Sequence, residues 1–240
     1  MNCLLSVIIP TYNEENRIKG TLLSILKYFS SKDYRIEIII TDDGSEDRTL
    51  DVVRNILENS GIQNQIISFP HNLGKGAVVK RGMLAARGEY HLFCDADLST
   101  PIDEVERFME YLVSGRADIV IGSRGLKESI ILEKQTKVRE YMGRMFNKLC
   151  NRIVFSNISD SQCGFKCFNK KASHFIFSLV KLNGFSFDAE VIFLASKYGF
   201  NLVELPVSWR NSSASKVKLL VDPVYMFYDI IRIRWLHRKL

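Results

Sequence analysis

Two aspartates, Asp95 and Asp97, stand two residues apart where the apolar run Tyr90–Cys94 ends. Their carboxylates can converge on one point, and hard oxygen ligands suit Mg²⁺ or Mn²⁺, with a diphosphate and water completing the coordination. That is the chemistry of a nucleotide-sugar site. The competing interpretation is a pair of turn aspartates, which would prevail if the Asp-x-Asp pattern stood alone.

Two further polar segments strengthen the first interpretation. Asp42-Asp43-Gly44-Ser45 could accept hydrogen bonds from a nucleobase and ribose, as acidic residues after a strand do in dinucleotide-binding folds. The alternative interpretation of this segment is an Asp-Gly turn that caps the next helix. In Asn72-Leu73-Gly74-Lys75-Gly76, flexible backbone and a lysine at a helix start suit an anionic diphosphate, although the Walker A spacing is absent.

The elements that must position these residues follow from hydrophobic patterning. Short β-branched runs alternate with helical segments, which predicts βαβ units and a mostly parallel sheet. The expected strands are Leu5–Ile9, Ile36–Ile40, Gln65–Phe69, Tyr90–Cys94 and Ile119–Ile121. The expected helices are Glu15–Tyr28, Asp47–Asn59, Gly76–Ala86 and Pro101–Leu112. Ligands of open sheets bind beyond the carboxyl ends of the strands, so the polar loops should converge on one edge.

The second half of the chain has a different character. A basic segment, Lys134–Arg144, leads into an amphipathic helix that continues to about Phe155. Asp222 as N-cap and Pro223 at the first helical position predict a final helix with a basic end. We divide the chain into one domain over residues 1–215 and a C-terminal amphipathic basic helix over 216–240.

The final helix places apolar and aromatic side chains on one stripe: Val224, Phe227, Tyr228, Ile231 and Trp235. An interfacial helix on an anionic membrane has this pattern. A helix packed on the domain has it too, and the sequence leaves both interpretations open.

Composition bounds the class of protein. The 240 residues are 46% hydrophobic and 25% charged, as in a globular protein with one large core. The net charge of +6 favours anionic partners, but no helix combines a basic stripe with base-stacking aromatics, so nucleic acid is not expected. Five scattered cysteines without a C-x-x-C pair argue against disulfides or a zinc site and favour a reducing, cytoplasmic compartment.

The apolar N-terminal run Leu4–Ile9 predicts a buried strand. It lacks a basic leader and is halted by Pro10, which argues against a secretory signal. No apolar stretch reaches the roughly 20 residues that cross a bilayer. Membrane contact is therefore expected to be peripheral, on the cytoplasmic face.

The motif-bearing segments are Val7–Glu14, Thr41–Ser45, Asn72–Gly76, Asp95–Asp97, Gly122–Arg124, Asp160–Lys166 and Phe185–Glu190. Together they resemble the inverting family 2 glycosyltransferases, whose GT-A fold is a Rossmann-like α/β fold with a mostly parallel central sheet flanked by helices. The likeness covers nearly the whole chain. It is greatest to the dolichyl-phosphate β-glucosyltransferases and other polyprenyl-phosphate hexosyltransferases.

The resemblance implies a role for each site residue. The nucleoside pocket would be lined by Pro10, Tyr12, Glu14, Asp42 and Asp43. Lys75 would lie near the diphosphate, with Asp95 and Asp97 at the metal, and the residues facing an acceptor phosphate would be Arg124, Arg139 and Arg210. The eukaryotic relatives carry an N-terminal membrane anchor, whereas this sequence starts directly at the first strand, which leaves its route to a lipid open.

The implied acceptor, a polyprenyl or dolichyl phosphate, has a second pKa near about 6 and is mostly dianionic at neutral pH. A strong general base is then less necessary than cations that position the phosphate and a metal that neutralises the departing diphosphate. We therefore assign catalytic roles to Asp97, Arg124 and Arg139. Asp160 either orients the acceptor, acts as a base toward a hydroxyl acceptor, or is a turn residue.

The expected reaction is transfer of a hexose, glucose from UDP-glucose, to the lipid phosphate with inversion. GDP-mannose as donor and a cell-surface polysaccharide as acceptor are the alternatives within the same class. A nucleotide-binding regulatory module without turnover is the alternative outside it, and intact Asp95, Asp97 and Lys75 count against that interpretation.

Overall fold

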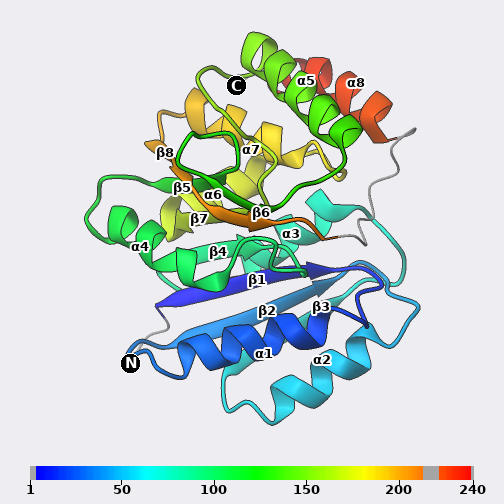
Figure 1. Cartoon of the computed structure of the whole chain (residues 1–240), viewed down its shortest axis with the longest axis vertical. Coiled ribbons are helices and arrows are strands. Elements are labelled where there is room, and N and C mark those ends of the chain that lie inside the picture. The colour runs from blue at the N-terminus through cyan, green and yellow to red at the C-terminus, as the bar shows by residue number, and fades with distance from the viewer. Residues whose placement is uncertain (1–3, 213–221, 239–240) are drawn as a thin grey trace.

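The computed structural model describes residues 4–212 and 222–238, which form a sheet flanked by helices (Figure 1). The strands are β1 (Leu5–Thr11), β2 (Ile36–Asp42), β3 (Gln63–Ser68), β4 (Tyr90–Cys94), β5 (Ile119–Ser123), β6 (Ile130–Glu133), β7 (Phe165–Asn169), β8 (Leu202–Pro206) and β9 (Ser208–Arg210). The helices are α1 (Ile18–Phe29), α2 (Thr49–Glu58), α3 (Lys75–Ala85), the 3₁₀ turn η1 (Ile102–Glu104), α4 (Val105–Val113), α5 (Lys137–Ile153), α6 (Lys170–Leu179), α7 (Phe187–Lys197) and α8 (Asp222–Leu236).

The central sheet has seven strands in the order β3-β2-β1-β4-β7-β5-β8. Neighbouring strands are parallel except at β7, which runs antiparallel to both β4 and β5. Strands β6 and β9 form a separate parallel pair. The mostly parallel α/β sheet that the alternating pattern predicts is therefore confirmed.

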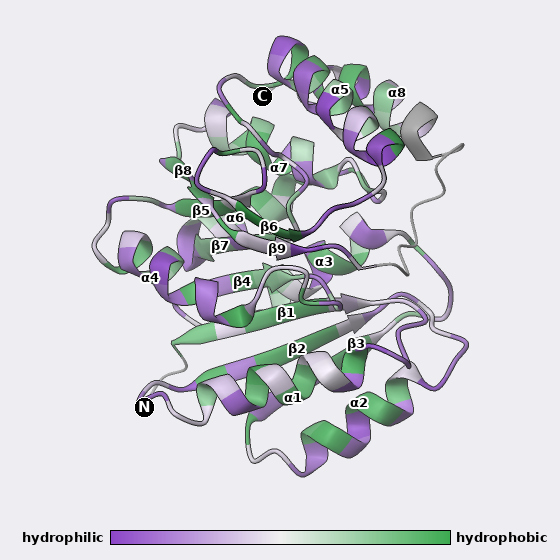
Figure 2. Cartoon of the chain, viewed as in Figure 1, coloured by the Kyte–Doolittle hydropathy of each residue, from purple (hydrophilic) through white to green (hydrophobic). Residues whose placement is uncertain are grey.

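The sheet separates two hydrophobic cores. Strands β1 and β2 are buried along their whole length, as parallel strands covered on both faces must be. Successive side chains of β1 point to opposite cores, so Val7 belongs to one and Ile8 to the other. Helices α1, α2 and α4 complete the first core, and α3 with α5, α6, α7 and α8 completes the second. Figure 2 shows the central strands as hydrophobic and the outer helices as mixed in character.

The first helix begins later than the sequence predicts. It starts at Ile18 and not at Glu15, because the residues before it are held by other contacts. The backbone N–H of Glu15 donates to Asp47 Oδ2 at 3.1 Å, and Asn13 adopts a positive φ of 52°. These contacts tie the end of β1 to the segment before α2, and residues 15–17 form a turn ahead of the helix.

Helix α8 begins at Asp222, as the Asp-Pro pair predicts, and lies beside α5 (Figure 1). The side chains of residues 222–224, and with them Val224, lie outside the described part. So does the boundary expected between residues 215 and 216. Among the described residues, no helix combines the length and apolar character that crossing a bilayer requires.

The apolar stripe predicted for α8 is split between two faces. Phe227 turns inward, where its ring lies 6.2 Å from that of Phe146 on α5. Tyr228, Ile231 and Trp235 point outward and are exposed. The helix is therefore packed on the domain by one face and leaves an aromatic face uncovered on the other.

Candidate functional site

A pocket of about 720 Å³ lies at the carboxyl edge of the parallel strands. Its walls come from the loops after β1, β2 and β4, as predicted, and from α5, α8 and the loop before α7. The pocket brings together most of the predicted site residues, namely Pro10, Tyr12, Glu14, Asp43, Lys75, Asp95, Asp97, Arg124 and Arg139. Three others, Asp42, Asp160 and Arg210, do not line it.

The acidic pair Asp95 and Asp97 lies on one wall of this pocket. A Cβ atom placed on Gly164 would overlap the Asp95 carboxylate, so the missing side chain makes room for it. Asp97 Oδ1 accepts the backbone N–H of Ser99 at 3.0 Å. Within the described ranges, no group of three or more His, Cys, Asp or Glu residues could hold a metal ion. The two hard carboxylates of Asp95 and Asp97 suit a divalent ion whose remaining ligands would come from diphosphate and water.

Lys75, the first residue of α3, places its ammonium group against the acidic pair. Its Nζ lies 2.7 Å from Asp95 Oδ1 and 5.3 Å from the centre of the Phe93 ring. Burial alone would lower the pKa of Lys75, but the carboxylates of Asp95 and Asp188 outweigh it and raise that pKa. The amine is therefore charged at neutral pH and suited to a diphosphate at the helix N-terminus.

A second, buried ion pair backs the same wall. Lys166 Nζ lies 2.6 Å from Asp188 Oδ1 and donates to the Cys163 carbonyl at 2.5 Å. Burial raises the pKa of Asp188, while Lys166 and Lys75 act in the opposite direction. Asp188 lines the pocket, and the positive charges of both lysines favour its ionised form.

The neighbouring aspartates after β2 have different surroundings. Asp43 lines the pocket, and its carboxylate accepts the N–H groups of Leu73 at 2.6 Å and Gly74 at 3.0 Å. Burial raises the pKa of Asp43. Asp42 is fully buried, and its Oδ2 accepts the N–H of Ser45 at 2.9 Å. Asp43 thus joins two pocket loops, while Asp42 holds the turn that the alternative interpretation describes.

Arg17 is a pocket residue that the sequence reasoning missed. Its guanidinium forms two hydrogen bonds with Glu14, at 2.6 and 2.5 Å, and lies 3.7 Å from Asp97 Oδ2. It also donates to Ser212 Oγ at 2.6 Å. The sequence holds no signal for this role, because an arginine inside a predicted helix is ordinarily a surface residue.

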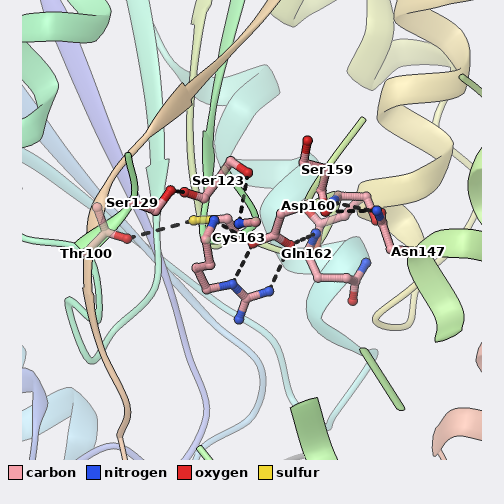
Figure 3. Close-up of polar contacts among 12 residues, drawn as sticks. Thr100, Ser123, Ser129, Asn147, Ser159, Asp160, Gln162 and Cys163 are labelled. Carbon is pink, nitrogen blue, oxygen red and sulfur yellow. Dashed lines mark hydrogen bonds and ion pairs between the residues drawn. The ribbon is translucent and has the colours of Figure 1, made fainter. Parts of the chain in front are cut away.

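Arg124 extends from the end of β5 and is held in place by Asp160. Its Nε and Nη2 lie 2.5 and 2.8 Å from the two carboxylate oxygens. The backbone N–H of Gln162 donates to the same carboxylate at 3.0 Å, and Figure 3 shows Asp160 and Gln162 close together. Burial would raise the pKa of Asp160, but Arg124 outweighs it and lowers that pKa. Asp160 is thus an ionised partner of Arg124 behind the pocket wall. The Arg124 guanidinium also lies 5.3 Å from the Trp209 ring centre.

Arg139 lines the same region of the pocket from α5. Its pKa is lowered by burial and by the positive charge of Arg124. Two guanidinium groups so placed form a cationic site that suits a phosphate. Arg210 is exposed outside the pocket, with Nε 3.2 Å from Glu133, so the structure does not bring it together with the other two arginines.

The wall beyond these arginines is apolar. Met142 and Phe146 contribute to it from α5, and Met226 and Phe227 contribute from α8. These side chains were not expected at the site, because an amphipathic pattern does not reveal which neighbour a helix packs against. The pocket therefore joins an acidic wall, a cationic wall and an apolar wall.

The fold and the site together define the class of protein. The sheet flanked by helices, with a pocket at its carboxyl edge, is the GT-A glycosyltransferase fold. Glucosyl-3-phosphoglycerate synthase from Mycobacterium tuberculosis, solved in complex with UDP, superposes with a TM-score of 0.73 at 17% identity, covering 96% of this chain and 80% of that chain. The same enzyme has been solved with Mn²⁺ and UDP, with a TM-score of 0.67 at 18% identity, covering 96% of this chain and 78% of that chain.

The chain belongs to glycosyl transferase family 2, whose pattern matches residues 6–177. Among similar proteins is the dolichyl-phosphate beta-glucosyltransferase of Dictyostelium discoideum, 34% identical, with 98% of this chain and 75% of that protein covered. The human dolichyl-phosphate beta-glucosyltransferase is 30% identical, with 96% and 74% covered.

Proposed function

We propose that this glycosyltransferase moves glucose from UDP-glucose to dolichyl or a related polyprenyl phosphate, with inversion at the anomeric carbon. The relatives named above support glucosyl transfer to dolichyl phosphate. One observation carries the proposal: a single pocket places an acidic pair with its lysine, two arginines and an apolar wall around one space. Each wall suits one part of the two substrates.

The acidic wall is the donor side. Asp95 and Asp97 would hold Mg²⁺ or Mn²⁺, which as a Lewis acid neutralises charge on the leaving diphosphate. Lys75 supplies a further positive charge at the diphosphate, since its ammonium group already lies beside Asp95. Pro10, Tyr12 and Asp43 lie at the loops where the nucleoside would bind, with Glu14 holding Arg17 at the same edge. Asp42 supports this region by fixing the turn after β2.

The cationic wall is the acceptor side. Arg124 and Arg139 would bind the lipid phosphate, and the apolar side chains of α5 and α8 would contact its first isoprene units. Asp160 then acts as a positioning residue, because both of its oxygens are hydrogen-bonded to Arg124. A dianionic phosphate needs no base to become a nucleophile.

The chemical step is a single displacement. An acceptor phosphate oxygen forms a bond to the anomeric carbon of glucose, while the bond from that carbon to the UDP oxygen breaks and UDP leaves with the electron pair. The arginines hold the nucleophile in line, which lowers the entropic part of the barrier. Attack opposite the leaving group turns an α-linked donor into a β-linked product.

This proposal places the enzyme at the surface of a membrane, on the cytoplasmic face. Its acceptor is embedded in a bilayer, whereas its nucleotide donor is water-soluble. The described cysteines, Cys94, Cys150, Cys163 and Cys167, are buried free thiols, which suits a reducing compartment.

The decisive experiment incubates purified protein with labelled UDP-glucose or GDP-mannose, a short-chain polyprenyl phosphate, and Mg²⁺, Mn²⁺ or EDTA. We expect a labelled lipid from UDP-glucose that disappears in EDTA and in Asp97→Ala, while circular dichroism of the variant is unchanged. Labelled lipid from GDP-mannose alone would replace the donor assignment. Absence of lipid product from either donor would refute the proposal, and full activity in EDTA would refute the metal role.

A further inference from the structure

Helices α5 and α8 lie side by side (Figure 1). Both helices carry large apolar side chains that are exposed. The most exposed are Tyr141 on α5, at 68%, and Ile231 on α8, at 67%. We call the whole set the α5–α8 face; it comprises Val138, Tyr141, Met145, Tyr225, Tyr228, Ile231 and Trp235. Single exposed apolar residues are common, but a set concentrated on two adjacent helices indicates a binding surface.

The charges on these two helices are predominantly positive. Exposed basic residues lie along both helices, and they are Lys137, Arg144, Lys148, Arg152, Arg232 and Arg234. The acidic side chains described on the same helices, Glu140 and Asp229, each form an ion pair with an arginine of their own helix. Figure 2 shows hydrophobic and hydrophilic residues alternating along both helices. Aromatic, aliphatic and basic side chains together are the composition of an interfacial helix on an anionic membrane.

The same two helices line the pocket with their other residues. Arg139, Met142 and Phe146 reach into it from α5, while Met226 and Phe227 reach into it from α8. Because each helix is thin, about 10–12 Å across with its side chains, the outer surface and the pocket wall are separated by one helix only. A molecule bound against the outer surface would therefore lie next to the acceptor end of the pocket.

We propose that the α5–α8 face docks this protein onto the surface of an anionic phospholipid bilayer. The proposal rests on the lipid acceptor of the proposed function and adds the surface that meets the membrane. Tyr141, Tyr228 and Trp235 suit the headgroup region, where amphipathic rings prefer to lie. The basic side chains attract anionic headgroups over about one Debye length.

A second copy of the chain is a poorer occupant of this face. A symmetric contact would bring the same surface of each protomer together. The basic residues of α5 and α8 would then oppose one another, with the described acids already paired internally. Charge complementarity favours an anionic lipid surface over self-association.

The test is flotation of the 240-residue protein with vesicles of phosphatidylcholine alone or mixed with phosphatidylglycerol. The variant is Ile231→Asp/Trp235→Asp, which changes two outward residues of α8 that do not line the pocket. The control is Leu23→Asp/Val113→Asp, which puts the same charges on exposed apolar positions of α1 and α4. We expect binding to anionic vesicles that weakens with salt, that falls at least about tenfold in the variant, and that persists in the control.

Equal vesicle binding by the variant and the wild type would overturn the proposal, as would failure of the wild type to bind anionic vesicles. Light scattering that shows a wild-type dimer lost in the variant, without vesicle binding, would assign the face to a second copy. Circular dichroism and UDP binding should be the same in all three proteins, which shows that the variant is folded. Vesicle binding needs no turnover, so this result is independent of whether glucose is the sugar transferred.

Discussion

Asp95 reaches the pocket because residue 164 has no side chain. Gly164 is the residue before β7, and its carbonyl accepts the N–H of Asp95 at 3.0 Å. The carboxylate of Asp95 occupies the space where a Cβ would stand. The glycine is therefore required by contact across two strands and not by its own backbone conformation.

Gly164→Ala should inactivate the protein while leaving it folded. The added methyl group would push the Asp95 carboxylate away from Lys75 and from the divalent ion that we propose it holds, and a shift of about 1 Å at a reacting centre can cost about a hundredfold in rate. We expect a loss of that size in kcat, together with weaker Mn²⁺-dependent UDP binding by calorimetry.

Gly20→Ala is the matched control for that substitution. Gly20 lies in α1, where an added Cβ meets no atom within 4 Å. Alanine in an exposed helical position should leave activity unchanged and raise stability by about 0.5–1 kcal/mol. Equal activity of Gly164→Ala and Gly20→Ala would show that the Asp95 position is not critical.

The substitution Asp160→Asn distinguishes two roles for Asp160, a residue that positions Arg124 and a general base. Asparagine keeps one oxygen acceptor but removes the charge that pairs with Arg124. If Asp160 positions Arg124, the KM for the acceptor rises at least about tenfold, UDP affinity is unchanged, and Asp160→Glu recovers part of the loss. If Asp160 were a base, kcat would fall by about 10²–10⁴ with the KM nearly unchanged, and the pH–rate profile would lose a limb. A thermal melt must accompany the assay, because Arg124 would lose its buried partner.

Residue types at strand ends were predictable, whereas contacts between distant segments were not. Asp43 and Asp95 follow strands, so their convergence on one edge is a consequence of the parallel sheet. Asp43 lines the pocket and Asp42 does not, because it is the carboxylate of Asp43 that accepts the N–H groups of Leu73 and Gly74. Neither that choice nor the position of Arg17 can be deduced from spacing along the chain.

At the scale of elements, the regular βαβ half was predictable and the second half was not. Strands β1, β2 and β4 are apolar runs bounded by polar loops, which is the strongest strand signal. Strand β7 inserts antiparallel between β4 and β5, far from its neighbours in sequence, and β9 has only three residues. Such pairings depend on the tertiary packing of α5, α6 and α7, which a local sequence pattern does not predict.

His91 of β4 makes the stability of the sheet depend on pH. The side chain is fully buried between Ser173 Oγ, at 2.8 Å, and the Gly88 carbonyl, at 3.0 Å. The carbonyl can only accept, so Nε2 carries the proton and Nδ1 accepts from the serine. Burial lowers the pKa of His91 from 6.5 to about 4, although the bond to Gly88 acts in the opposite direction.

The unfolded chain therefore binds one more proton than the folded chain between pH 6.5 and about 4. Above pH 6.5 His91 is neutral in both states, so it does not make the free energy of unfolding depend on pH. Between pH 6.5 and about 4 the free energy of unfolding falls by about 1.4 kcal/mol per pH unit, which gives a total loss of about 3 kcal/mol. Urea unfolding of the wild type and of His91→Gln at a series of pH values below neutral measures this loss. It is the change with pH in the difference between their free energies of unfolding. Parallel curves for the two proteins would contradict the prediction.

On the scale of the whole molecule, the two hydrophobic cores lie beneath different sets of helices. Both cores join elements that are distant in sequence: the core under α1, α2 and α4 also contains Phe165 of β7 and Trp209 of β9, and the second core gathers α3 with α5 to α8. Ile230 and Ile233 of α8 belong to the second core and are almost completely buried. Helix α8 is therefore packed against the domain by its inner face, which is one of the two interpretations that the sequence leaves open.

Two isoleucines on opposite faces of α8 allow this packing to be measured within one helix. Ile233 is 0% exposed and Ile231 is 67% exposed. Ile233→Ala should lower the free energy of unfolding by about 2–5 kcal/mol, because it removes buried apolar surface and leaves a cavity. Ile231→Ala should change it by no more than about 0.5 kcal/mol. Urea denaturation followed by circular dichroism should also show one transition in both variants. If Ile233→Ala cost no more than Ile231→Ala, or if α8 melted in a separate transition, the helix would be an appendage and the second core would end before it.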